Sequence, residues 1–115
     1  MVLNDIERKA AERTVGAFIE KRRSPAHIRP ELDLGFRVRG QSVELFEIRP
    51  RWKAPEKKME HPVAKATMVR SQGVWKIYWQ CADLKWHSYE PLPEVAALDK
   101  VLAVVSEDRH ACLWG

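Results

Sequence analysis

The stretch LDLGFRVRGQSVELFEIRP, Leu32 to Pro50, has the sequence pattern of a β-hairpin. Apolar residues alternate with polar or small ones up to Arg39, which is the period of a half-buried strand. Gly40-Gln41 suits a tight two-residue turn, because glycine accepts positive φ at the first position. The resulting hairpin places Arg37 opposite Glu44. After Leu45 the apolar residues change parity, at Phe46 and Ile48, which predicts either a β-bulge at that step or cover on both faces; we favour the bulge.

The flanking segments extend this hairpin into an α+β domain. Asn4 and Glu7 form a capping-box pattern that opens a helix, and Pro25 ends it. Three more strands are predicted over 63–70, 74–81 and 86–90, with turns at 71–73 and 82–84. Residues 51–61, RWKAPEKKMEH, have no clear period and are expected to form a mobile excursion. A second helix is expected to open at Pro91-Leu92-Pro93, with Val95, Leu98, Leu102 and Val105 as its buried stripe.

Short successive connections give an antiparallel meander of five strands, with the N-terminal and C-terminal helices packed on one face. The 115 residues suffice for a single domain, 1–115, that needs neither metal nor disulfide to fold. No apolar run has membrane-spanning length, and the N-terminus lacks the pattern of a secretory signal. We therefore expect a cytoplasmic protein with reduced cysteines, and no membrane partner.

The net charge of +4 is unevenly distributed. Residues 1–60 hold fourteen Lys and Arg against ten Asp and Glu, whereas residues 61–115 hold six of each. The basic residues gather around Arg22 and Arg23 and again from Arg49 to Lys58, where Trp52 interrupts them. Arginine for phosphates and an exposed aromatic ring for bases are what a binder of single strands needs. The candidate anchors for an anionic partner, nucleic acid above all, are Arg22, Arg23, Arg49, Arg51, Trp52 and Lys53.

The stretch VWKIYWQCADLKWHSYEP, Val74 to Pro91, is rich in aromatic residues. Trp75, Ile77, Trp79 and Cys81 share one strand face and are expected to form the core. The opposite face is predicted to gather an exposed aromatic patch of Lys76, Tyr78, His87 and Tyr89. Such a patch is typical of a binding surface, but cross-strand aromatic pairs also simply stabilise a sheet.

Several motifs in this chain resemble one bacterial family of small proteins. They are Gly40–Pro50 (G-x-x-V-x-L-F-E-I-R-P), Pro62–Lys65 (P-V-A-K), Trp75–Trp79 (W-K-I-Y-W), Ala82–Tyr89 (A-D-L-K-W-H-x-Y) and Cys112–Gly115 (C-x-W-G). Their order along residues 32–115 is similar to that in the domain of unknown function 3024 family. The resemblance implies a small, single-domain bacterial protein and supplies no activity, substrate or catalytic residue.

The sequence supports an enzymatic function more weakly than a binding function. Asp83-Leu84-Lys85 fits a fragment of metal-dependent nucleases, with His87 beside it, but needs a second carboxylate from Asp33 or Glu47. The plainer interpretation of Asp83 is a turn residue that bonds its own backbone. The chain holds two thiols and two imidazoles, the ligand types of a zinc site, at Cys81, His87, His110 and Cys112. They lack the usual short spacings of such a site, so no metal or cofactor is predicted.

The remaining alternative is contact with a protein partner or self-association through a sheet edge or the tail ACLWG, Ala111 to Gly115. A tail with Cys112, Leu113 and Trp114 is expected to run back along the sheet, because burying the indole offsets the entropy of ordering a short segment.

Overall fold

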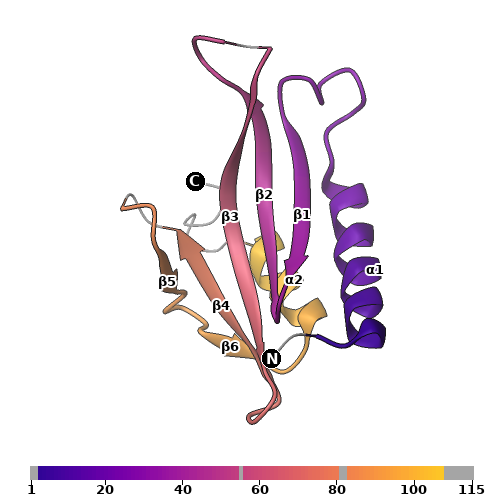
Figure 1. Ribbon diagram of the computed structural model, residues 1–115, viewed down its shortest axis with the longest axis vertical. Coiled ribbons are helices and arrows are strands. Elements are labelled where there is room, and N and C mark those ends of the chain that lie inside the picture. Colours follow the sequence, from indigo (N-terminus) through magenta and orange to yellow (C-terminus); the bar gives the residue numbers. More distant parts are fainter. Residues whose placement is uncertain (1–2, 55, 81–82, 108–115) are drawn as a thin grey trace.

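The computed structural model describes residues 3–54, 56–80 and 83–107. One helix is followed by a meander of strands and a second helix, so the predicted α+β arrangement is confirmed (Figure 1). The sheet order is β1-β2-β3-β4-β5, and a short additional strand, β6, pairs with β4.

Helix α1, Asp5–Arg22, begins as the sequence predicts. The Asn4 side chain accepts a hydrogen bond from the Glu7 N–H at 2.8 Å, and the Glu7 carboxylate accepts one from the Asn4 N–H at 2.9 Å. These two bonds satisfy N–H groups that the first helical turn leaves without partners. The helix turns Ala11, Val15 and Ile19 inward and ends before Pro25.

Strands β1, Asp33–Arg39, and β2, Ser42–Pro50, form the predicted hairpin. Gly40 has φ of 61°, and Arg37 lies opposite Glu44. A register shift does lie between Leu45 and Phe46, but its extra residue is on β3, so the favoured phase shift within β2 is wrong and both faces are covered there. The pairing of β2 with β1 stays regular there, so Phe46 lies on the face opposite Leu45.

Strand β3, Lys58–Val69, begins earlier than expected, and this corrects the predicted excursion over 51–61. Arg49 pairs with Met59 and Pro50 with Lys58, which leaves only residues 51–57 as the connection. The first five residues of β3 are all exposed. A strand that reaches beyond the helices is solvated on both faces, so it carries no hydrophobic period that would reveal it.

Strand β4, Val74–Gln80, continues to β5, Trp86–Ser88, which is shorter than predicted. Beyond it, Glu94–Val95 forms β6 rather than the first turn of a helix, and α2 spans Leu98–Glu107. Val95 pairs with Trp75, and the Pro93 carbonyl accepts a hydrogen bond from the Ile77 N–H at 2.9 Å. Pro93 therefore takes part in the sheet as a hydrogen-bond acceptor.

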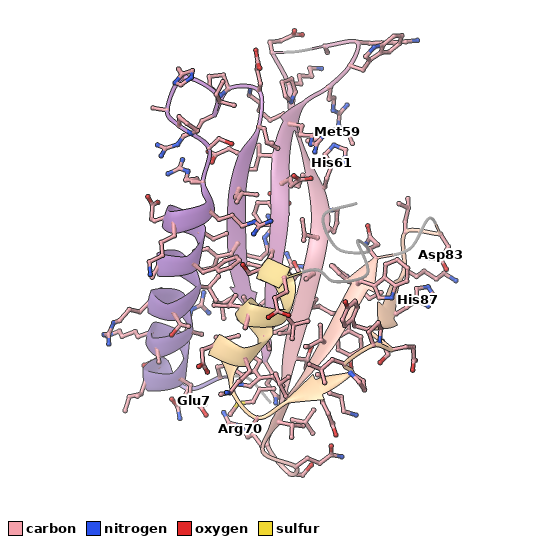
Figure 2. All side chains as sticks on the ribbon, turned by 180° about the vertical axis from the view of Figure 1, so that it is seen from behind. Glu7, Met59, His61, Arg70, Asp83 and His87 are labelled. Atoms are coloured by element: carbon pink, nitrogen blue, oxygen red, sulfur yellow. The ribbon has the colours of Figure 1, made fainter. Side chains whose placement is uncertain are left out.

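Both helices pack on one face of the sheet, and α2 lies behind the strands in Figure 1 and in front of them in Figure 2. The core between them includes the fully buried Val15, Ile77, Val101 and Val105, with Trp75 at 8% exposure. We call the side of the sheet turned away from α1 and α2 the outer face. By strand register it carries Arg37, Glu44, Phe46, Lys65, Tyr78 and Trp86.

Candidate nucleic-acid interface

The tip of the β2–β3 hairpin presents an exposed aromatic ring. Backbone hydrogen bonds close the connection: the Arg51 N–H donates to the Lys57 carbonyl at 2.8 Å, and the Lys57 N–H to the Ala54 carbonyl at 2.8 Å. Trp52 is 88% exposed, and the Lys53 ammonium lies 5.6 Å from the centroid of its ring. The tip thus holds an indole and a cation together in water.

The charge at the tip is strongly positive. Residues 51–58 hold four Lys and Arg and one glutamate. Among the described residues, Arg51, Lys53 and Lys57 have no ion-pair partner. Lys58 donates a hydrogen bond to the Pro30 carbonyl, which joins the hairpin to the α1–β1 connection at the same end of the molecule (Figure 1). Arg49, a predicted anchor, lies 3.1 Å from Glu47 and is partly neutralised.

The two arginines at the end of α1 differ in role. Arg23 donates two hydrogen bonds to the Asp33 carboxylate, at 2.7 and 2.8 Å, and also lies 3.3 Å from Glu20. The paired guanidinium lowers the pKa of Asp33 to about 2 and raises that of Arg23. Arg23 therefore ties α1 to β1, while Arg22 is exposed at the last turn of the helix.

The structure corrects half of the predicted aromatic patch. His87 pairs with Trp79, and Tyr89 is only 2% exposed, with its N–H donating to the Ile77 carbonyl at 2.9 Å. Both belong to the helix side of the sheet, because directly opposed residues share a face. Lys76 and Tyr78 do lie on the outer face, where Lys76 faces Glu94.

Two residues that the sequence reasoning missed complete the outer face near Tyr78. Gln80 pairs with Trp86, so the Trp86 ring shares this face, and Lys65 lies opposite Tyr78. The Lys65 ammonium is 5.3 Å from the Tyr78 ring centroid and 5.1 Å from that of Trp86. A turn centred on Asp83 places Gln80 opposite Trp86. The strand register expected from the sequence would therefore have put Trp86 on the outer face.

Asp83 acts as a turn residue. Its carboxylate accepts a hydrogen bond from the Lys85 N–H at 3.0 Å and lies 2.9 Å from the His87 ring nitrogen (Figure 2). The Lys85 N–H and His87 together lower the pKa of Asp83. Asp83, Lys85 and His87 are all exposed.

The second carboxylate that a nuclease site needs does not join this turn. Asp33 on β1 is bonded to Arg23, and Glu47 on β2 pairs with Arg49. Strands β3 and β4 separate both carboxylates from β5. Within residues 3–54, 56–80 and 83–107, no three His, Cys, Asp or Glu side chains gather closely enough to hold a metal ion. Cys81, His110, Cys112 and the tail ACLWG lie outside the described residues.

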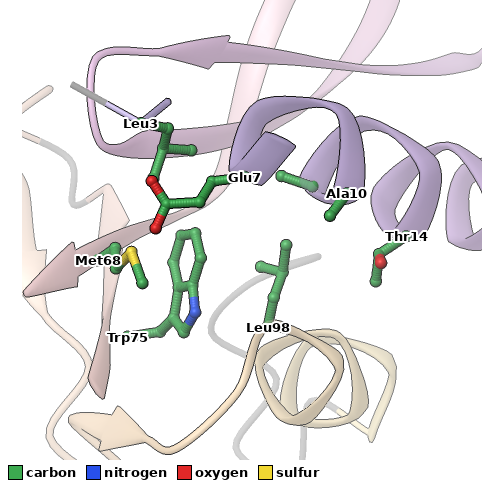
Figure 3. Close-up of a pocket in the computed structure, with 8 residues that line it drawn as sticks. Leu3, Glu7, Ala10, Thr14, Met68, Trp75 and Leu98 are labelled. Atoms are coloured by element: carbon green, nitrogen blue, oxygen red, sulfur yellow. The ribbon is translucent and has the colours of Figure 1, made fainter. Parts of the chain in front are cut away.

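A cavity of about 200 Å³ lies between α1, α2 and the indole of Trp75 (Figure 3). Its lining is largely apolar, with Leu3, Met68 and Leu98 around the ring. The one carboxylate there, Glu7, binds Arg70 in a two-point ion pair that lowers the pKa of Glu7. The cavity thus offers no set of converging polar groups for catalysis.

The fold and the tip define a small α+β protein whose sheet is covered by helices on one face and extends a basic, tryptophan-bearing hairpin. The chain belongs to the family described as Domain of unknown function (DUF3024), whose model matches residues 3–115. This membership confirms the resemblance seen in the motifs, and the family brings no activity with it. No curated protein and no solved structure matches the chain. None of the described helices is both long and apolar enough to cross a membrane.

Proposed function

We propose that this protein is a non-enzymatic binding module for nucleic acid, and that the β2–β3 hairpin tip takes an unpaired base and its phosphates. The observation that carries the proposal is the exposure of Trp52, at 88%, among three cations without ion-pair partners in the described chain. An indole left in water forgoes a few kcal/mol of burial at roughly 25 cal/mol per Å². Trp52 belongs to no part of the hydrophobic core, so its ring is available to a ligand that covers it.

The chemistry of the tip matches single strands in particular. Every base has an aromatic face that stacks on an indole, whereas in a duplex those faces are already stacked on one another. Arg51, Lys53 and Lys57 lie within the same connection and supply cations for the phosphates that flank such a base. Arg22 is a further candidate, and Arg49 a weaker one because Glu47 shares its charge.

Salt dependence of binding tests the proposal. Fluorescence anisotropy is measured with labelled oligo-dT and oligo-U of about 12 nucleotides, within the range that single-strand binding folds occupy. Three phosphate contacts predict a slope of about −2 for log affinity against log salt, and Arg51→Ala or Lys53→Ala each make it shallower by about 0.7. Lys9→Ala is the matched control, since Lys9 is an exposed cation in the first half of α1, away from the tip (Figure 1).

An exposed tryptophan among cations can also contact an anionic lipid surface. The same protein is therefore titrated with vesicles made of equal parts phosphatidylcholine and phosphatidylglycerol. Oligonucleotide binding that weakens with salt supports the proposal. Vesicle binding without oligonucleotide binding, or no binding of either at low salt, overturns it.

Self-association through a sheet edge and the tail ACLWG remains the alternative function. It depends in part on residues outside the described ranges and stays a prediction.

A further inference from the structure

The outer face of the sheet carries two cation–ring clusters that differ in one respect. In the first, the Arg37 guanidinium lies 4.7 Å from the Phe46 ring centroid. Arg37 is also 2.6 Å from Glu60 and 3.8 Å from Glu44. Phe46 is only 8% exposed, so this cluster is closed: its ring is covered, and two carboxylates offset its one guanidinium.

The second cluster is open. Lys65 lies between the Tyr78 and Trp86 rings, at 5.3 and 5.1 Å from their centroids. Both rings are half-buried, and neither α1 nor α2 covers this side of the sheet (Figure 1). Lys65 forms no ion pair within the part of the chain that the structure describes, because Glu44, which lies opposite it on β2, is turned to Arg37.

We infer that Lys65, Tyr78 and Trp86 form a second subsite for the single strand, an inference that rests on the proposed function of the hairpin tip. Two rings on neighbouring strands offer a stacking surface for an unpaired base, and the Lys65 ammonium between them can move from the rings to the adjacent phosphate. Lys76 is on the same face but lies farther from the tip, opposite Glu94, so it is not counted in the subsite. Single-stranded nucleic acid is thus the ligand class that fits both the rings and the charge.

The separation of the two subsites sets the length of strand that can reach both. Lys58, at the base of the tip, and Lys65 are seven residues apart on β3. At about 3.3 Å per residue, and with one residue taken by the bulge, this is roughly 20 Å. A stacked strand, at about 3.4 Å per nucleotide, covers this span with about six nucleotides, and an extended strand covers it with fewer. Strands of about two nucleotides should therefore occupy one subsite at a time, and strands of about 12 should occupy both.

The experiment combines location with length. Oligo-dT carrying one 5-iodouracil at successive positions is photocrosslinked to the unaltered protein, and the crosslinked residues are mapped by mass spectrometry. We expect adducts at Trp52 and also at Tyr78 or Trp86. Tyr78→Leu and Lys65→Gln should each weaken binding of the strand of about 12 nucleotides by roughly tenfold. They should weaken binding of the strand of about two nucleotides much less, because it still has the tip.

Tyr78→Phe is the matched control, because it keeps the ring and should bind as the unaltered protein does. Thermal melting of each variant checks that the sheet is intact, and the crosslinking needs no variant at all. If adducts map only to the tip and Tyr78→Leu binds both lengths normally, the second subsite does not exist while the proposed function stands. If no oligonucleotide binds, both fail together.

Discussion

Gly35→Ala tests the packing of the outer face. A Cβ atom on Gly35 would lie 2.5 Å from Cε2 and 2.9 Å from Cζ of Phe46, and 3.4 Å from Cδ1 of Ile48. The Phe46 ring cannot simply swing aside, because the Arg37 guanidinium lies over it at 4.7 Å and is itself held by Glu60. Overpacking of this kind costs about 1–3 kcal/mol.

The loss is measured as a fall in melting temperature. With 115 residues the entropy of unfolding is about 0.24 kcal/mol/K, so about 2 kcal/mol lowers Tm by roughly 8 °C. Gly16→Ala is the matched control. Its Cβ would meet only the Phe36 ring, at 3.9 Å, and alanine in a helix interior is favoured by about 1 kcal/mol, so Tm should rise by roughly 4 °C. A Gly35→Ala protein that melts like the unaltered one would refute the packing of Phe46 on Gly35.

Three further predictions concern stability. Because Arg23 lowers the pKa of Asp33 from 3.8 to about 2, the ionised carboxylate stabilises the folded state above pH 4, and this contribution is lost as pH falls from about 4 to 2. Asp33→Asn should lower the free energy of unfolding measured in urea by about 1 kcal/mol at neutral pH. It should also flatten the dependence of this free energy on pH between about 4 and 2. An unchanged pH dependence would show that the Arg23–Asp33 pair does not cause it. Glu7→Gln should lower Tm in calorimetry, though less than Gly35→Ala does, because it weakens the ion pair between Glu7 on α1 and Arg70. An unchanged Tm would show that this ion pair does not stabilise the fold. Deleting residues 113–115 should lower Tm by several degrees. Unchanged stability together with lost self-association would instead make the tail an interface.

Local rules predicted the parts of the fold that depend on neighbouring residues. The capping box at Asn4 and the Gly40 turn each rest on residues that are close in sequence, and both are confirmed. The early start of β3 and the strand β6 rest on pairing between distant segments. Val95 lies beside Trp75 in the sheet, and nothing in the residues around Val95 distinguishes that place from a helix start after Pro93.

The candidate site divides in the same way. Trp52 could be found from the sequence, because an aromatic residue within a basic, period-free segment has no core to join. The sequence could not show that Arg23 and Arg22 differ in role, because Arg23 binds Asp33 and this carboxylate lies on another element. Lys65 was missed because its significance comes from two rings on strands that follow it in the chain.

Whether the hairpin tip contacts nucleic acid is tested by comparing Trp52→Ala with Trp52→Phe in binding an oligonucleotide of about 12 nucleotides at low salt. Because Trp52 is 88% exposed, both variants should keep the Tm of the unaltered protein. Loss of one stacked base is worth about 1–3 kcal/mol, so Trp52→Ala should bind roughly 5- to 150-fold more weakly, while Trp52→Phe keeps most of the affinity. A Trp52→Ala protein that binds the oligonucleotide as tightly as the unaltered protein would contradict the assignment of the hairpin tip as a nucleic-acid contact.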